Sequence, residues 1–315
     1  MTDFSPATVC AVIVSYHPAL ETLRHLIDTV APQVGAVTLV DNSAPDNWQQ
    51  TLGETMRGGG GVLLTQPHNA GLAAAQNVGI DWARAHGYQH VLLLDQDSVP
   101  GVGMVASLLA ALQQLSVSAR VAAVGPRFHD LREERDAPFV HIRFPFNRKL
   151  WCTNAAQHVT CDFLISSGTL IPMKVLEQVG VMDAALFIDN VDMEWSFRAQ
   201  ARGYALYGVC AATMSHRLGD TRYRLPFGVG RVVVHQPLRL YYMMRNRLLL
   251  YRMSHVPRAW VAQDVPRVFA KLFLFGVLIG PRMRNLRFML HGLWDGVRGR
   301  NGECMISAGQ QGAPE

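Results

Sequence analysis

The first hundred residues alternate short, unbroken apolar runs with longer stretches in which apolar residues recur every three or four positions. The stretches at Leu20–Val30 and 70–85 have helical spacing, and Asn69 is the expected N-cap of the second. The short runs are typical of strands buried on both faces, and they lie at Val9–Ser15, 36–40, Val62–Thr65 and 90–94. This order predicts an α/β fold with a doubly wound, mostly parallel sheet.

Polar residues follow every one of these strands at its carboxyl end, the edge at which ligands bind in doubly wound sheets. Strand by strand, they are Ser15-Tyr16-His17, Asp41-Asn42-Ser43, His68-Asn69-Ala70-Gly71 and Asp95-Gln96-Asp97. No G-x-G-x-x-G follows the first strand, and the chain has no G-x-x-x-x-G-K-[ST]. These absences argue against a dinucleotide-binding fold and against a P-loop nucleotidase.

Two carboxylates lie directly after the fourth strand, in the stretch VLLLDQDSVP. Asp95 and Asp97 are close enough to repel each other unless a cation lies between them. Oxygen ligands favour a hard ion, so the pair predicts a Mg²⁺ or Mn²⁺ site that also holds a substrate diphosphate. The alternative is a solvated turn in which D-x-D has no function. His216, after a short apolar run, is a candidate third ligand, although a lone histidine is more often structural.

A third group of acids opens an expected helix in the stretch LFIDNVDMEWSFRAQARGY. Asp189, Asp192 and Glu194 there suit the helix dipole, which is the structural explanation. Their apolar flanks argue against a solvated face, so one of them is a candidate general base for an acceptor hydroxyl. Arg198 is expected to hold the group by a bidentate pair.

A further candidate element is an apolar strand at 163–171, FLISSGTLI, which contains Ser167 and Gly168. Glycine inside a strand often marks the close approach of a ligand. Both residues, together with Trp195, are therefore candidates for the acceptor side of the site.

The charge is divided unevenly along the chain. Residues 1–230 hold 16 Lys+Arg and 20 Asp+Glu, whereas residues 231–300 hold 13 Lys+Arg and only two acids. The second part is also apolar, but its uncharged run at 272–281 is about half of the roughly 20 residues that a spanning helix needs. We expect a segment that lies on an anionic membrane surface; the alternatives are a basic helical tail packed on the protein and a nucleic-acid-binding tail.

The five cysteines form no C-x-x-C pair and no metal-finger spacing, so reduced, mostly buried thiols are expected. The start MTDFSPAT lacks the features of a signal peptide. We therefore expect a cytoplasmic protein, peripheral on the inner face of the cytoplasmic membrane.

The motifs AVIVSYHP, LVDNS, NAGLAAAQNVGI, LLLDQDS, ISSGTLI, FIDNVDMEWSFRAQARGY and SHRLGD occur in this order. In that order they resemble the family-two inverting glycosyltransferases, which have the nucleotide-sugar-binding GT-A fold. LFIDNVDMEWSFRAQ, PLRLYYMMRNRLLL and GLWDGVRGR are similar to its rhamnosyltransferase branch, which acts in rhamnolipid and O-antigen synthesis. The resemblance covers roughly residues 9–300.

The resemblance implies a role for each motif residue. Asp41 would recognise the nucleotide base beside Ser15 and Tyr16, and Asp95 would lie near the ribose. Asp97 would hold the metal ion, with His216 as a further metal or diphosphate contact. The wall around the donor would include Asn69, Gly71 and Asn77, and a subfamily signature would add Arg245 and Asn246. Asp192 would be the base, with Asp189 as its rival.

The implied reaction transfers L-rhamnose from dTDP-L-rhamnose, with inversion, to a glycolipid or lipid-linked saccharide. The alternatives are a related transferase that uses UDP-glucose, UDP-galactose or a GDP-sugar, and a metal-dependent nucleotidyltransferase or hydrolase. No nucleic-acid partner is expected. We expect a catalytic domain at 1–230, a basic helical membrane-surface segment at 231–300 and a disordered tail at 301–315.

Overall fold

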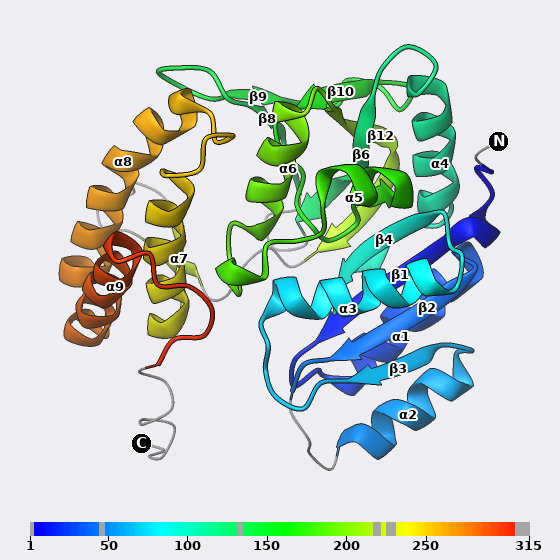
Figure 1. Cartoon of the computed structure of the whole chain (residues 1–315), viewed down its shortest axis with the longest axis horizontal. Coiled ribbons are helices and arrows are strands. Elements are labelled where there is room, and N and C mark those ends of the chain that lie inside the picture. Colours follow the sequence, from blue (N-terminus) through cyan, green and yellow to red (C-terminus); the bar gives the residue numbers. More distant parts are fainter. Residues whose placement is uncertain (1–2, 44–47, 131–134, 217–221, 225–230, 306–315) are drawn as a thin grey trace.

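The computed structural model describes residues 3–43, 48–130, 135–216, 222–224 and 231–305 (Figure 1). Across these residues a ten-stranded mixed sheet has the main order β10-β12-β6-β11-β4-β1-β2-β3. The first four strands of the chain pair in parallel, as expected, and β12 is parallel to β6. The strand β11 lies antiparallel between β4 and β6 and joins the two parallel parts.

The strands of the main sheet are β1 (Val9–Ser15), β2 (Ala36–Asp41), β3 (Val62–Thr65), β4 (His90–Asp95), β5 (Val99–Pro100), β6 (Val121–Asp130), β7 (Arg135–Asp136), β10 (His158–Cys161), β11 (Leu170–Pro172) and β12 (Ala205–His216). Two small ribbons pair β8 (Phe139–His141) with β9 (Arg148–Leu150), and β13 (Arg222–Arg224) with β14 (Arg231–Val233). The helices are α1 (Leu20–Val30), α2 (Trp48–Gly58), α3 (Leu72–Ala85), α4 (Met104–Leu115), α5 (Met173–Val179), α6 (Val191–Ala201), α7 (Pro237–Leu250), α8 (Arg258–Phe273) and α9 (Arg282–Val297).

Helices cover both faces of the sheet, because each central strand buries both rows of its side chains. In β1, Val9, Ala11 and Ile13 pack with residues of α1, α2 and α4. The alternate residues Val12 and Val14 pack in the core that includes α3, α5 and α6. This arrangement is the three-layer fold that the unbroken apolar runs predict.

The basic segment forms a helical unit beside α6 (Figure 1). Helix α7 packs against α9, and a π-helical turn at Leu274–Leu278 joins α8 to α9. No helix among the described residues is long and apolar enough to cross a membrane.

Two local expectations are corrected by the structure. Helix α3 begins at Leu72 with Gly71, not Asn69, as its N-cap; the Asn69 side chain still accepts a hydrogen bond from the Gly71 amide. The expected strand at 163–171 is reduced to β11, because the segment before it forms a loop.

Two further expectations concern the cysteines and the tail. Cys10, Cys161 and Cys304 are buried free thiols, but Cys152 and Cys210 form a disulfide with their Cα atoms 5.6 Å apart. These two are 58 residues apart, a separation that gives no local signal. Residues 301–305, expected to be disordered, pack on the protein: Cys304 is buried, and the amide of Gly302 donates to the Ala185 carbonyl.

Candidate active site

The carboxyl edge of the sheet brings the predicted polar residues together. In the register of the strands Ser15 lies level with Asp41, and Val14, one residue earlier, lies level with Asp95. The strands that carry Asp41 and Asp95 flank β1, so their backbones are about 10 Å apart at this edge. That spacing leaves room for a ligand between the two carboxylates.

Asp41 is almost fully buried, and a set of serine contacts fixes its orientation. Its Oδ1 accepts hydrogen bonds from Ser15 Oγ at 3.3 Å and from Ser43 Oγ at 2.7 Å. Asn42, which has no individual role in the sequence analysis, connects two loops: its Nδ2 donates to Asn69 Oδ1 at 2.8 Å, and its Oδ1 accepts from the Ala70 amide. Asn69 therefore ties the loops after β2 and β3 to each other.

Gln96, the middle residue of the D-Q-D stretch, holds the loop after β1. Its Oε1 accepts from the Tyr16 amide at 2.7 Å, and its Nε2 donates to the Tyr16 carbonyl at 3.2 Å. The Tyr16 ring remains about half exposed. This loop is thus fixed in its backbone and presents an aromatic face at the edge of the site.

Asp95 and Asp97 lie on the turn between β4 and β5, and both are partly exposed. Strand β5 pairs with the end of β12, with Val99 level with Ser215. The next residue along β12, His216, therefore comes level with Ser98, beside Asp97; its side chain lies outside the described residues. The turn supplies hard oxygen ligands, which fits a divalent cation. Within the described residues no three His, Cys, Asp or Glu side chains are grouped to hold a metal ion.

Ser167 and Gly168 contact protein where the sequence argument expected an acceptor. The buried Ser167 Oγ accepts from the Asp95 amide at 2.9 Å and lies 2.5 Å from Ser98 Oγ. Gly168 has φ +79°, and a Cβ there would lie 2.7 Å from Pro126. The serine therefore braces the Asp95 turn, and the glycine is required by its conformation and by packing.

Asp192 lies in the first turn of α6, where its carboxylate accepts from the Met193 amide at 2.8 Å. Burial raises the pKa of this carboxyl to about 6. The N–H groups of Met193 and Ser166 lower that pKa, and the charges of Asp95 and Asp189 raise it. Asp192 is therefore close enough to Asp95 for the two charges to interact.

The two other acids of this segment have protein partners. Asp189 pairs with Arg239 of α7 at 3.1 Å. Glu194 is 2% exposed, and Arg198 donates to both of its oxygens at 2.8 Å. The bidentate pair expected for Arg198 is thus formed with Glu194, and His255 Nε2 lies 2.9 Å from the same carboxylate. Of the three acids, Asp192 has the environment of a base.

Four predicted contact residues form hydrogen bonds with the protein backbone. Asn77 exchanges two 2.9 Å hydrogen bonds with Met182, and Trp195 Nε1 donates to the Gly180 carbonyl. Arg245 and Asn246 are fully buried and donate to carbonyl groups before α6. These side chains therefore support the backbone around the site. Their partners lie too far along the chain for a local sequence pattern to predict them.

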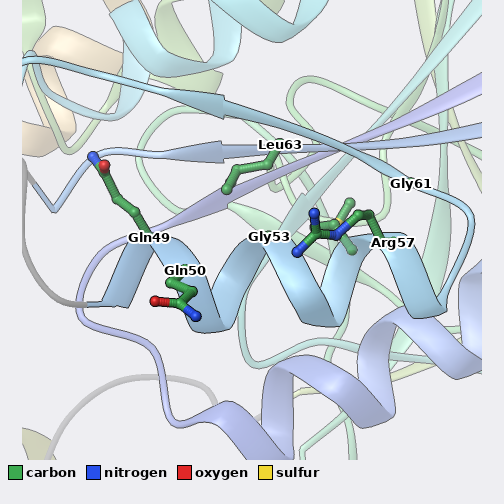
Figure 2. Close-up of a pocket in the computed structure, with 7 residues that line it drawn as sticks. Gln49, Gln50, Gly53, Arg57, Gly61 and Leu63 are labelled. Atoms are coloured by element: carbon green, nitrogen blue, oxygen red, sulfur yellow. The ribbon is translucent and has the colours of Figure 1, made fainter.

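A separate hollow of about 350 Å³ lies between α2 and the edge strand β3 (Figure 2). Gln49, Gln50 and Arg57 supply its polar side chains, and Leu63 supplies part of its apolar wall. None of the residues proposed for chemistry lines it, so it is not part of the candidate site.

Comparison with solved structures shows the same fold at low sequence identity. GalNAc-T7, crystallised with UDP, GalNAc and Mn²⁺, superposes with a TM-score of 0.60 at 14% identity over 90% of this chain. This chain spans 54% of the GalNAc-T7 chain, about half of its length. A fragment of S. aureus TarS in complex with UDP-GlcNAc gives a TM-score of 0.55 at 12% identity, covering 93% of this chain and 81% of that one. The mannosyltransferase PcManGT from Pyrobaculum calidifontis, with GDP-Man and Mn²⁺, gives 0.53 at 13%, covering 96% and 79%.

Sequence comparison identifies a more similar relative. The dTDP-rhamnosyl transferase RfbF of Shigella flexneri is 30% identical over 300 residues, which cover 94% of this chain and 97% of that protein. The profile of glycosyl transferase family 2 matches residues 10–178, from β1 to the end of α5 and thus across the aspartates of the carboxyl edge. With its GT-A sheet and its polar carboxyl edge, the chain belongs to glycosyl transferase family 2 and is a glycosyltransferase.

Proposed function

We propose that this enzyme transfers L-rhamnose from dTDP-L-rhamnose to a hydroxyl group of a glycolipid or lipid-linked glycan. The observation that carries the proposal is the 30% identity to the Shigella flexneri dTDP-rhamnosyl transferase, which extends over nearly all of both chains. Similarity on this scale includes the helical unit as well as the sheet. The solved neighbours are complexes with other nucleotide sugars, so they support a donor of this class and not its identity.

In the proposed reaction Asp192 is the general base. It takes the proton from the acceptor hydroxyl as that oxygen attacks the anomeric carbon on the face opposite the leaving diphosphate. One displacement inverts the anomeric configuration, and the reaction needs no covalent nucleophile. A pKa of about 6 leaves the carboxylate largely ionised at neutral pH, yet basic enough to accept a proton.

The donor lies between the first two aspartates of the edge in this proposal. Asp41 recognises the nucleotide base beside the loop of Tyr16, and Asp95 lies near the ribose. Asp97 holds a divalent cation, with His216 as a further ligand. When bound, Mg²⁺ or Mn²⁺ stabilises the negative charge that develops on the departing diphosphate.

The acceptor side is proposed to face a membrane. Helix α9 exposes a stripe with helical spacing, formed by Met283, Arg287, Leu290, Trp294 and Val297. Helix α8 exposes a similar stripe, formed by Val265, Phe269 and Phe273. Apolar side chains beside arginines match the boundary of an anionic bilayer, which is where a lipid-linked acceptor lies. In this proposal the two stripes, here called the membrane face, bind the inner face of the cytoplasmic membrane.

The donor is tested by nucleoside diphosphate release from purified enzyme with Mg²⁺ or Mn²⁺. The donors are dTDP-L-rhamnose, UDP-glucose, UDP-N-acetylglucosamine and GDP-mannose, each with and without a mono-rhamnolipid acceptor. We expect turnover of dTDP-L-rhamnose alone. Preferred turnover of any other donor would overturn the proposed sugar and leave the fold and family unaffected.

The same assay, compared with and without mono-rhamnolipid, distinguishes two classes of acceptor. Stimulation by mono-rhamnolipid supports rhamnolipid synthesis, whereas slow release that is independent of it directs the search to lipid-linked glycans. Nuclear magnetic resonance of the product gives the anomeric configuration. Retention of configuration would contradict a single displacement with Asp192 as base.

A further inference from the structure

The loop before α6 has a backbone conformation that its own sequence does not favour. Phe187, Asp189 and Asn190 all have φ near +65°, and none of them is glycine. Asn and Asp tolerate positive φ better than other residues with side chains, but phenylalanine rarely adopts it, so the surrounding structure must hold Phe187 there. Residues 187–190, here called the base loop, lead directly into the turn of α6 that carries Asp192.

One buried amide on α7 binds two carbonyl groups of the base loop and the carbonyl group of the residue before it. Asn246 Nδ2 lies 2.9 Å from the Leu186 carbonyl oxygen, 2.7 Å from that of Ile188 and 2.9 Å from that of Asp189. Two N–H bonds are thus shared among three acceptors that converge on one point. Leu186, Ile188 and Asp189 thus turn three carbonyl groups, within a stretch of four residues, towards the same donor.

Arg245 orients that amide. Its Nε donates to Asn246 Oδ1 at 3.0 Å, and its Nη2 donates to the Leu186 carbonyl at 2.9 Å. Both side chains are fully buried, so their polar groups would lose hydrogen bonds without replacement by water if the loop moved. The two residues therefore hold each other as well as the loop.

Other side-chain contacts with the base loop come from the same helix, and from the sheet side the Ala73 amide of α3 donates to the Phe187 carbonyl. The ring of Phe187 stacks on Tyr242 with centroids 4.9 Å apart, and Arg239 pairs with Asp189. Arg239, Tyr242, Arg245 and Asn246 all belong to α7, which lies in the helical unit outside the sheet (Figure 1). The segment that presents Asp192 is thus shaped from the helical unit.

We propose that Asn246, oriented by Arg245, is a positioning residue: it holds the base loop in its left-handed form and thereby places the Asp192 carboxylate. The proposal rests on the proposed function, in which Asp192 is the base. In this proposal α7 contributes to catalysis, because Arg245 and Asn246 position the base loop instead of contacting the donor.

The test compares Asn246→Ala with Asn285→Ala. Asn285 is a matched control, because it is a buried asparagine of the same helical unit whose Nδ2 binds two carbonyls, those of Phe275 and Ile279. Three quantities are measured for each variant: kcat and donor KM with dTDP-L-rhamnose, the unfolding temperature, and hydrogen exchange of the peptide that covers residues 185–195.

For Asn246→Ala we expect kcat to fall about 100-fold, the loss typical of a misplaced reacting group, with donor KM nearly unchanged. Hydrogen exchange should become faster across the base loop and the first turn of α6. Asn285→Ala should lower the unfolding temperature and leave kcat and the exchange of this peptide close to wild type. Equal losses of kcat in both variants would overturn the proposal, since Asn246 would then act only through overall stability.

A rescue experiment tests the conformation itself. Glycine adopts positive φ at little cost, so Asn190→Gly should restore at least fivefold of the lost kcat in the Asn246→Ala background. Absence of rescue would contradict a role in holding the left-handed loop. If Asn246→Ala does not fold, Arg245→Lys, which loses the Nε contact but keeps the charge, is tested for the same rescue.

Asp192→Asn separates the two proposals. If this variant keeps its turnover, the assignment of the base is wrong, whatever Asn246 does. If it loses turnover while Asn246→Ala keeps both its turnover and its slow exchange, the positioning role is wrong and the base remains.

Discussion

Among single residues, Asp192 differs from the other acids of its segment because it has no cationic partner in the described structure, whereas Asp189 and Glu194 each pair with an arginine. Burial and the neighbouring charges of Asp95 and Asp189 raise its pKa from 3.8 to about 6. A carboxyl group in this state exchanges its proton within the physiological range. The same acid without this environment would be a weaker base at neutral pH.

This pKa predicts the pH dependence of the reaction. The protonated carboxyl cannot accept a proton, so activity is lost as the pH falls through about 6 and is retained above it. We expect kcat/KM for the donor, which reports groups of the free enzyme, to fall about tenfold per pH unit below that point. Steady-state assays of the wild type between pH 5 and 8 measure the profile. A wild-type profile that is flat across this range would remove Asp192 from the role.

The sequence identified the polar edge of the site but not the residues that support it. Asp41, Asp95 and Asp97 follow apolar strands, and the register of parallel strands brings such ends together. Asn77 and Asn246 gave no comparable signal, because each binds backbone about 60 to 105 residues away. In a helical sequence pattern, a buried asparagine that contacts a ligand cannot be distinguished from one that contacts a distant loop.

Among the elements, strands and helices with a strong period were predicted closely, and the irregular ones were not. Helix Leu20–Val30 and strand Val62–Thr65 have the expected bounds, because burial alone decides those patterns. The apolar segment 163–171 instead forms a loop before β11, because Ser167 and Gly168 serve the Asp95 turn and the packing against Pro126. Long-range hydrogen bonding thus overrides the local preference for a strand.

Helix α6 carries Glu194, which we expect to stabilise the fold, and Asp192, which we expect to act in the chemistry. Substitution of Glu194 should therefore lower stability, and substitution of Asp192 should lower turnover. Glu194→Gln breaks a buried ion pair and leaves Arg198 without its counter-charge, so it should lower the free energy of unfolding by about 3 kcal/mol. The kcat of the folded variant should stay within about threefold of wild type, since Glu194 makes no contact with the reacting groups in our proposal. Urea denaturation and turnover at low temperature measure the two effects.

Asp192→Asn is the matched comparison for that variant. It should abolish turnover without a fall in stability, because it removes a partly buried charge that has no cationic partner among the described side chains. A Glu194→Gln variant that is fully stable yet inactive would show that the ion pair acts in the chemistry and not in the fold.

At the scale of the whole molecule, the surplus of positive charge in residues 231–300 divides into two parts. Arg239 and Arg247 of α7 pair with Asp189 and Asp264, so the charges of these two arginines are balanced within the protein. The arginines of α9, including Arg284 and Arg287, are exposed. The expected basic tail is thus both a packed helical unit and a charged outer surface, and deletion of the segment would remove the support of the base loop.

Point variants on the membrane face therefore test docking better than truncation does. Each exposed arginine near an anionic bilayer contributes about 1 kcal/mol, so the charge reversals Arg284→Glu and Arg287→Glu together should weaken binding at least tenfold. The pair Phe273→Ser and Trp294→Ser should weaken it through lost apolar insertion, an effect that persists in high salt, whereas the arginine contribution is screened. Co-sedimentation with phosphatidylglycerol vesicles at low and high salt measures both.

The control for these variants is Val117→Ser, which removes an exposed apolar side chain just after α4. Helix α4 lies away from the helical unit (Figure 1). It should bind vesicles as the wild type does. All variants should turn over the donor in solution with near-normal kcat, since none of them contacts the base loop or the carboxyl edge. Equal vesicle binding by wild type and both double variants would show that the exposed stripes of α8 and α9 do not meet a membrane, and the acceptor would then have to reach Asp192 from solution.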